Sequence, residues 1–269
     1  MSADVTEATL PPATPQARFT LVLPGRTCSI GAGWTWIAQG WRLFARAPVM
    51  WIVSLIILMI IAFALMLVPF LGHIALQVLG PVFAAGLVLA CAATETEGSF
   101  ELGELFGGFR TRFGSLAMLG VLFFIGQIAI AVVCIAIVGF GSMAAIFGML
   151  VSGDTQGAAQ ALMAAGLTIA LASLVGLALF VPLLAAIWLA PALVVMHGVG
   201  PLKAMGASFS ACLRNFLPFL WYGIVMFVLS IVAAIPVMLG YLVLVPMMFT
   251  STYASYRGIF TEGEIGDAP

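Results

Sequence analysis

Residues 48–70 read PVMWIVSLIILMIIAFALMLVPF, a run of 23 residues without a charged side chain. About 20 apolar residues, each adding 1.5 Å to a helix, cross a hydrocarbon core of roughly 30 Å. Backbone groups in lipid must be satisfied within their own segment, so such a run must be helical. The run therefore predicts a transmembrane helix.

Five further apolar runs indicate a membrane protein of several spans. They cover 72–93, 114–138, 164–190, 216–235 and 237–256. Hydrophobic residues are 64% of the 269 residues and charged residues 7%, whereas about 25% are charged in a typical soluble domain. The runs lack the alternation of apolar and polar residues that a membrane barrel needs. We predict an all-α fold, a polytopic membrane bundle of six transmembrane helices.

The basic residues lie on one side of this arrangement. None falls within a run, and the connections between runs one and two, three and four, and five and six contain none. Because short loops rich in Lys and Arg stay in the cytoplasm, both termini are predicted to be cytoplasmic. We expect residues 1–29 to form a flexible cytoplasmic tail, 30–260 a single transmembrane domain and 261–269 a second cytoplasmic tail. The nine basic residues are Arg18, Arg26, Arg42, Arg46, Arg110, Arg112, Lys203, Arg214 and Arg257.

Three short amphipathic helices are predicted on the cytoplasmic side, each before an odd-numbered span. In residues 33–46, GWTWIAQGWRLFAR, one face is apolar and the opposite stripe carries Arg42 and Arg46. Tryptophan on one face and arginine on the other is typical of a helix lying in the membrane interface. The pattern returns at 201–214 and more weakly at 99–112. The apolar face of the first helix is assigned to Trp34, Ile37, Trp41, Phe44 and Ala45.

A threefold internal repeat is also predicted. One unit consists of a surface helix, a span, a tight outer turn and a proline-containing span. Pro81, Pro182 and Pro246 mark the last span of the three units. The middle unit holds an outer-side insert, 139–163, expected to extend spans three and four beyond the membrane or to lie on its outer surface. Any six-span chain with short loops looks periodic, so this alternative to a repeat stays open.

Candidate contact residues follow from position in this plan. Ionisable side chains are costly at membrane depth, and no Asp, Glu, Lys or Arg falls within the six runs. Gln127, Gln77 and His73 are candidates for intramembrane polar contacts: Gln127 as a tie between helices or a ligand contact, and Gln77 with His73 as a small outward polar site. The candidate interfacial anchors, which would touch anionic headgroups, are Arg46, Arg112, Arg214, Trp34, Trp41 and Lys203.

No catalytic, cofactor-binding or metal-binding residue is predicted. The two histidines lie far apart in the topology, so they form no zinc cluster. Neither a GxSxG sequence nor a Gly-rich phosphate loop is present. Glu95, Glu97, Glu101 and Glu104 are expected in a solvated acidic loop that caps a helix start; a cytoplasmic-face enzyme using Glu101 or Glu104 is the least favoured alternative. The net charge of −1 indicates no nucleic-acid partner, and the four cysteines are expected to be reduced and structural.

Three stretches resemble a family of uncharacterised bacterial inner-membrane proteins: APALVVMHGVGPLKAMGASFSACLRN (190–215), GWTWIAQGWRLFARAP (33–48) and YASYRGIF (253–260). The first also resembles, more weakly, the membrane domain attached to some glycerophosphodiester phosphodiesterases, whose catalytic domain is absent here. The resemblance implies an integral protein of the bacterial inner (cytoplasmic) membrane with six spans. It implies no established activity.

The function predicted is that of a non-enzymatic integral inner-membrane protein that acts through lipid or protein contacts, as a scaffold or accessory subunit of a membrane complex. Its expected partners are membrane lipids and other membrane proteins at the cytoplasmic-face helices, and no cofactor is expected. The alternative is a transporter or permease for a neutral or lipid-like substrate. Coupling to ions is disfavoured because the runs contain no acidic relay.

Overall fold

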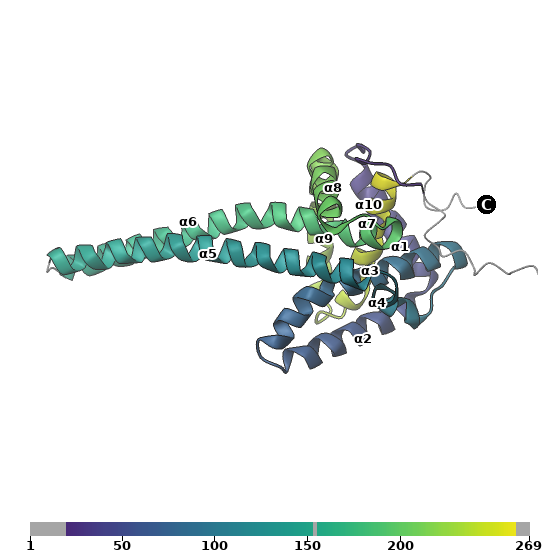
Figure 1. Ribbon diagram of the computed structural model, residues 1–269, viewed down its shortest axis with the longest axis horizontal. Helices are drawn as coiled ribbons and strands as arrows, with labels where there is room; N and C mark the ends of the chain where they lie inside the picture. The colour runs from purple at the N-terminus through teal and green to yellow at the C-terminus, as the bar shows by residue number, and fades with distance from the viewer. Residues whose placement is uncertain (1–19, 153–154, 262–269) are drawn as a thin grey trace, which may run out of the picture.

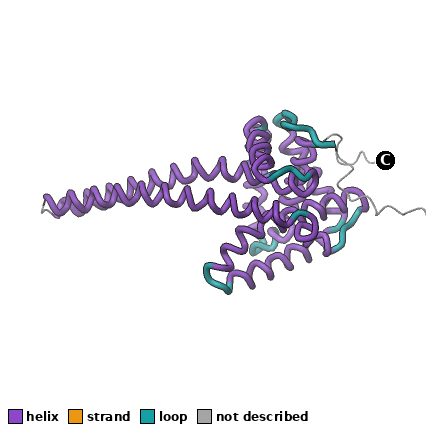
Figure 2. The backbone as a smooth tube through the Cα atoms, viewed as in Figure 1, coloured by secondary structure: helices purple, strands orange, loops and turns teal. Residues whose placement is uncertain are grey.

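The computed structural model describes residues 20–152 and 155–261, which form helices joined by short connections (Figures 1 and 2). An all-helical architecture is therefore confirmed for the described residues, apart from one isolated bridge between Leu21 and Thr261. In chain order the helices are α1 Ala32–Arg46, α2 Pro48–Met66, α3 Leu71–Glu97, the 3-10 helix η2 Leu102–Phe106, α4 Gly107–Thr111, α5 Phe113–Ser152, α6 Thr155–Trp188, α7 Ala190–His197, α8 Pro201–Arg214, α9 Phe216–Ala234 and α10 Tyr241–Phe260.

Five stretches of described helix are long and apolar enough to cross a membrane: Pro48–Met66, Leu71–Glu97, Phe113–Gly139, Ala165–His197 and Phe216–Ala234. The sixth predicted span, 237–256, is not among them. Its helix, α10, begins at Tyr241, and its second half carries polar side chains that are buried in the protein, including Thr250, Ser251 and Arg257. Packing against neighbouring helices, rather than against lipid, accounts for the polar composition of this half.

The helices α5 and α6 form a long hairpin that projects from the rest of the molecule (Figure 1). α5 contains 40 residues and α6 contains 34, so α5 is about 60 Å long at 1.5 Å per residue. The predicted insert, 139–163, continues both helices as far as Ser152 and from Thr155 onward. The described part of the insert is therefore a continuation of these two helices, and its position relative to the membrane stays a prediction.

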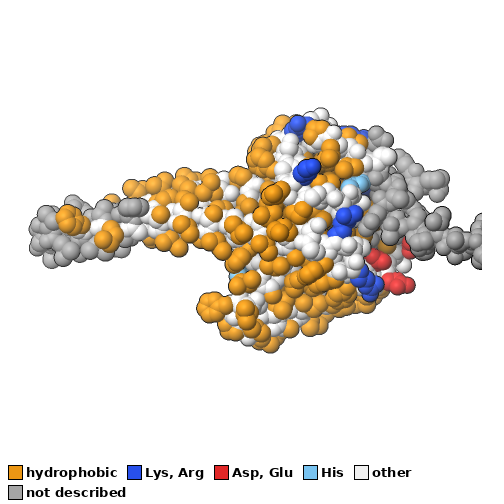
Figure 3. Space-filling view, in the orientation of Figure 1, with side chains coloured by type: hydrophobic (Ala, Val, Ile, Leu, Met, Phe, Trp, Pro, Cys, Tyr) orange, Lys and Arg blue, Asp and Glu red, His pale blue; other side chains and the backbone are white. Residues whose placement is uncertain are grey.

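Two of the three proline-containing helices, α3 and α10, lie at the centre of the molecule, whereas α6 belongs to the projecting hairpin. Pro81, Pro182 and Pro246 lie inside α3, α6 and α10. The second half of α3, most of α7 and the second half of α10 are buried, whereas α2, α5 and α9 expose apolar side chains along most of their length. Figure 3 shows this apolar surface on the hairpin and on the body below it. The inner helices therefore supply the core, and the outer ones face lipid.

The apolar face predicted for α1 is wrong in part. This face was predicted to lie in the membrane interface, but Ile37 and Phe44 are buried in the protein together with Trp36 and Leu43, while Trp34 and Trp41 are 59% and 50% exposed. The cause is a close approach of two backbones, because a Cβ added at Gly40 would lie 2.6 Å from the backbone nitrogen of Ser251 in α10. One side of α1 is thus fixed in the protein core, and the two tryptophans lie beside that contact.

The amphipathic helix predicted at 99–112 is instead two short pieces, η2 and α4. They fold back onto α3, where a Cβ at Gly108 would meet the carbonyl oxygen of Val82 at 2.3 Å. Gly107 and Gly108 weaken a continuous helix and permit this close contact. The prediction was based on the apolar spacing and did not account for the break that the glycines introduce.

The tail predicted at 1–29 also differs from the structure in its second part. The backbone nitrogens of Val22 and Arg26 donate to the carbonyls of Phe260 and Ile259, both at 2.8 Å, and the guanidinium of Arg26 donates to the carbonyl of Thr261. Residues 20–29 are therefore attached to the end of α10. Residues 1–19, and residues 262–269 of the predicted tail 261–269, lie outside the described residues.

Candidate functional site

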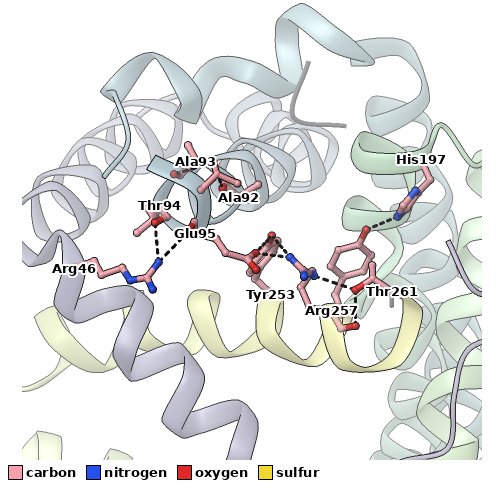
Figure 4. Close-up of polar contacts among 11 residues, drawn as sticks. Arg46, Ala92, Ala93, Thr94, Glu95, His197, Tyr253, Arg257 and Thr261 are labelled. Atoms are coloured by element: carbon pink, nitrogen blue, oxygen red, sulfur yellow. Dashed lines mark hydrogen bonds and ion pairs between the residues drawn. The ribbon is translucent and has the colours of Figure 1, made fainter. Parts of the chain in front are cut away.

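A polar junction forms where the ends of α3, α7 and α10 meet (Figure 4). Glu95 lies in the last turn of α3 and His197 at the end of α7, while Tyr253, Tyr256 and Arg257 lie in the last two turns of α10. The spacing of these α10 residues, at i, i+3 and i+4, puts them on one side of a helix. Three segments that are far apart in the sequence thus bring their polar side chains together.

The centre of the junction is a buried ion pair. Arg257 Nη1 donates to Glu95 Oε2, and both side chains are only 4% exposed. The hydroxyl of Tyr253 donates to the same carboxylate oxygen at 2.7 Å, and Arg257 Nε donates to Thr261 Oγ1 at 2.9 Å. Burying a charge is costly unless it is paired and hydrogen-bonded. These contacts meet that requirement and fasten α10 to α3.

Two further contacts join α7 and α1 to this centre. The hydroxyl of Tyr256 and Nε2 of His197 lie 2.6 Å apart and share a hydrogen bond. Arg46 Nη1 donates to the backbone carbonyls of Thr94 and Glu95, at 3.3 and 3.1 Å. A cation at the last carbonyls of a helix is favourable because those groups lack partners in the helix and carry its negative dipole end. Arg46 therefore links α1 to the end of α3.

A small pocket of about 130 Å³ lies next to the junction. Side chains of α3, α6, α7 and α10 line it, and Tyr253, Tyr256 and Thr252 supply its hydroxyl groups. The indole N–H of Trp188, another lining residue, is buried without a hydrogen-bond partner in the described part of the chain. The rest of the lining is apolar. Its chemistry suits a small neutral guest better than an ion.

The intramembrane candidates lie away from this junction. Gln77 Nε2 donates to Gln127 Oε1 at 2.6 Å, which joins α3 to α5. The backbones also approach closely here, because a Cβ at Gly120 would meet the carbonyl oxygen of Val78 at 2.5 Å. His73 is exposed one turn before Gln77 and is not a partner in this bond. The structure thus brings together the two glutamines but not the histidine.

The candidate anchors are exposed at the end of the molecule where the basic side chains gather (Figure 3). Arg112 lies against the backbone after α7, since a Cβ at Gly198 would meet its guanidinium nitrogen Nη2 at 2.5 Å. The remaining candidates are exposed on α1 and α8: Trp34, Trp41, Lys203 and Arg214. Their contact with headgroups stays a prediction.

The four cysteines are free thiols in the structure. Cys28 and Cys212 lie outside the apolar spans. Burial raises the pKa of Cys28, and it raises the pKa of Cys212 to about 11 against a smaller opposing effect of the hydrogen bond with Ser208. Both side chains are therefore protonated at neutral pH, when a thiol is a poor nucleophile. Within the described residues, no group of three or more His, Cys, Asp and Glu side chains could hold a metal ion.

The prediction for Glu95 was wrong. It assigned this residue to a solvated loop, whereas α3 continues to Glu97 and buries the Glu95 side chain. The signal available in the sequence was the apolar and small-residue stretch 82–93, which leads directly into Thr94 and Glu95 without a helix breaker. Arg257 was placed just beyond the last predicted span, whereas α10 continues to Phe260 and includes it.

A bacterial protein is similar to this sequence over nearly its full length. A "probable inner membrane protein" of Burkholderia thailandensis is 30% identical over 261 residues, which cover 88% of this chain and 94% of the relative. The chain belongs to the same family of inner-membrane proteins. No family model and no solved structure matches it, so the weaker resemblance to the membrane domain of glycerophosphodiester phosphodiesterases gains no support.

Membership of this family agrees with the apolar surface and the five membrane-capable stretches. The chain is an integral membrane protein, and its relative is named as a probable inner-membrane protein. The relative's name states a location and no activity.

Proposed function

We propose that six helices cross the inner membrane and that both termini lie in the cytoplasm. Arg46, before α2, contacts the end of α3, and Arg112, before α5, lies against the residue after α7. Asn215, before α9, accepts from the backbone nitrogen of Cys28, whose thiol contacts the carbonyl of Gly258 in α10. Each pair of long helices thus begins and ends at one side of the molecule. The positive-inside rule assigns that side to the cytoplasm.

Reporter fusions test this topology. A fusion between Ser152 and Thr155 is expected to be active as a periplasmic reporter, and fusions after Gly98 and Gly200 as cytoplasmic reporters. A fusion after Phe260 separates six spans from five, because a periplasmic signal there would mean that α10 does not return to the cytoplasmic side.

We infer that the protein acts as a non-enzymatic membrane component through lipid or protein contacts. One observation carries this proposal. The buried carboxylate of Glu95 is paired with Arg257 and hydrogen-bonded by Tyr253, so it is not free for acid–base chemistry. By contrast, α8 exposes large apolar side chains at the basic end, with Leu202 at 72% and Leu213 at 58% exposed. Exposed apolar groups of this kind are typical of contact surfaces.

Photocrosslinking in native membranes tests the contact surface. A photoreactive residue at Leu202 or Leu213 is expected to yield a discrete protein adduct or a retained lipid. The same residue at Ile60 of α2, which is 62% exposed, is the control for general contact with bulk lipid. If Leu202 and Leu213 give the same products as Ile60, and the purified protein retains neither partner nor lipid, the proposal is wrong.

We further propose that three units repeat, each formed by a surface helix, a span and a proline-containing span. Support comes from Arg46, which lies beside the end of α3, and from Arg112, which lies beside the residue after α7, the short helix that follows the proline-containing α6. Replacing either with Gln is expected to lower the free energy of unfolding by about 0.3–1 kcal/mol, the usual contribution of a cation at a helix C-terminus. A loss at one position alone, measured by denaturant titration in detergent, would contradict the equivalence.

A transporter for a small neutral substrate is the second candidate, favoured by the pocket between the proline-containing helices. The glutamines assigned to such a pathway do not line that pocket but bond to each other. Uptake of a substrate by vesicles containing the protein, lost on replacing the lining residue Ala192 with Phe but not Gln127 with Leu, would favour this candidate.

A further inference from the structure

A groove of about 640 Å³ opens between α1 and the hairpin of α9 and α10. One side consists of Trp34, Trp41 and Arg42 together with smaller apolar residues of α1. The other side consists of the second half of α9, the first half of α10 and the turn between them, and every lining residue there is apolar. Its volume lies in the range of about 300–1,000 Å³ usual for ligand pockets. We name it the α1 groove.

The charges and aromatic rings of the α1 groove are distributed unevenly. Arg42 is the charged member of its lining, is exposed, and makes no hydrogen bond or ion pair with the described part of the chain. Trp34 and Trp41 lie on the same side of α1 and are half exposed. Tryptophan favours the headgroup level of a bilayer, and an arginine there attracts anionic lipid. The polar side of the groove thus matches a headgroup, and its apolar side matches an acyl chain.

We propose that the α1 groove binds one anionic phospholipid, with the phosphate at Arg42 and an acyl chain along the apolar side formed by α9 and α10. This inference rests on the proposed membrane-contact function and names its ligand. A lipid fits better than a protein helix because part of the apolar side belongs to α9. This helix is long and apolar enough to cross a membrane, and its side chains Ile231 and Val232 are exposed. The lone cation complements one phosphate.

Co-purification of lipid from mixed vesicles tests the site. The whole protein is reconstituted in equal amounts of phosphatidylglycerol and phosphatidylcholine, extracted in mild detergent, and its retained lipid is measured by native mass spectrometry. Wild type is expected to retain one lipid and to prefer phosphatidylglycerol. Arg42→Gln should reduce this preference about fivefold, the effect of one basic residue near a membrane surface. Arg110→Gln, the same charge change at an exposed position of α4 outside the groove, should leave it unchanged.

A second pair of variants tests the apolar side. Val232 lines the groove and is 55% exposed, whereas the adjacent Ile231 does not line it and is 53% exposed. Val232→Trp should fill the groove and abolish retention of both lipids, and Ile231→Trp should retain them. Equal effects within either pair would overturn the site. Loss of the site with the α8 crosslinks preserved would leave the proposed function standing, whereas loss of both would remove both.

Discussion

Glu95 and Arg257 depend on each other for their burial. Replacing Glu95 with Gln leaves the guanidinium buried without its counter-charge, and breaking a buried pair in this way costs about 3–5 kcal/mol. We expect Glu95→Gln and Arg257→Gln each to lower stability strongly and the double variant to lose less than the sum of the two. Unfolding in detergent measures the free energies. Glu97→Gln is the control, because Glu97 is exposed two residues later on the same helix; an equally large loss there would contradict the assignment.

Single polar residues were the least predictable part of this protein. The apolar spacing located Gln77 and Gln127 within the spans but could not pair them, because their bond joins residues 50 apart in sequence. Glu95 and Arg257 lie next to apolar runs and therefore resembled loop and tail residues. These two residues are buried because α3 packs against α10, and this tertiary contact cannot be deduced from a single sequence.

Glycine contacts decide how closely α1 and α10 pack. A Cβ at Gly40 would meet backbone atoms of Ser251, which cannot move aside as a flexible side chain could. We expect Gly40→Ala to lower the free energy of unfolding by about 1–3 kcal/mol, the usual cost of overpacking. Gly206 in α8 has no atom within 4 Å of such a Cβ, so Gly206→Ala should raise stability by about 0.5–1 kcal/mol through helix propensity. Thermal unfolding of both variants checks the opposite signs.

The helices themselves were largely predictable because hydropathy and length are local properties. The run 216–235 corresponds to α9, Phe216–Ala234, and 48–70 contains α2. Prediction failed at 99–112, where glycines fit α4 against α3. It also did not foresee the buried polar residues of α10 that pack against α1. The predicted order of surface helix and span is the same in the structure, but the surfaces that these short helices bury are not readable from periodicity alone.

The length of the α5–α6 hairpin relates the whole molecule to its membrane. Phe147 lies 34 residues after Phe113, or about 51 Å along the helix at 1.5 Å per residue. A bilayer measures about 40–45 Å with its headgroups. If Phe113 lies at the cytoplasmic interface and the hairpin is nearly upright, Phe147 must lie beyond the outer headgroups, whereas Ile125, about 18 Å from Phe113, lies within the hydrocarbon.

Cysteine labelling distinguishes an upright hairpin from one tilted into the bilayer. In a variant whose native cysteines are replaced by Ala, we expect Phe147→Cys to react with a membrane-impermeant maleimide in intact spheroplasts and Ile125→Cys to remain unlabelled. Both native side chains are exposed on the protein, at 69% and 55%, so a difference in labelling reports depth rather than burial by neighbouring helices. Labelling of both after the cells are opened and the membrane is dissolved is the control. Protection of Phe147→Cys until detergent is added would mean that the hairpin is tilted or lies along the outer leaflet, since only lipid could then shield so exposed a position.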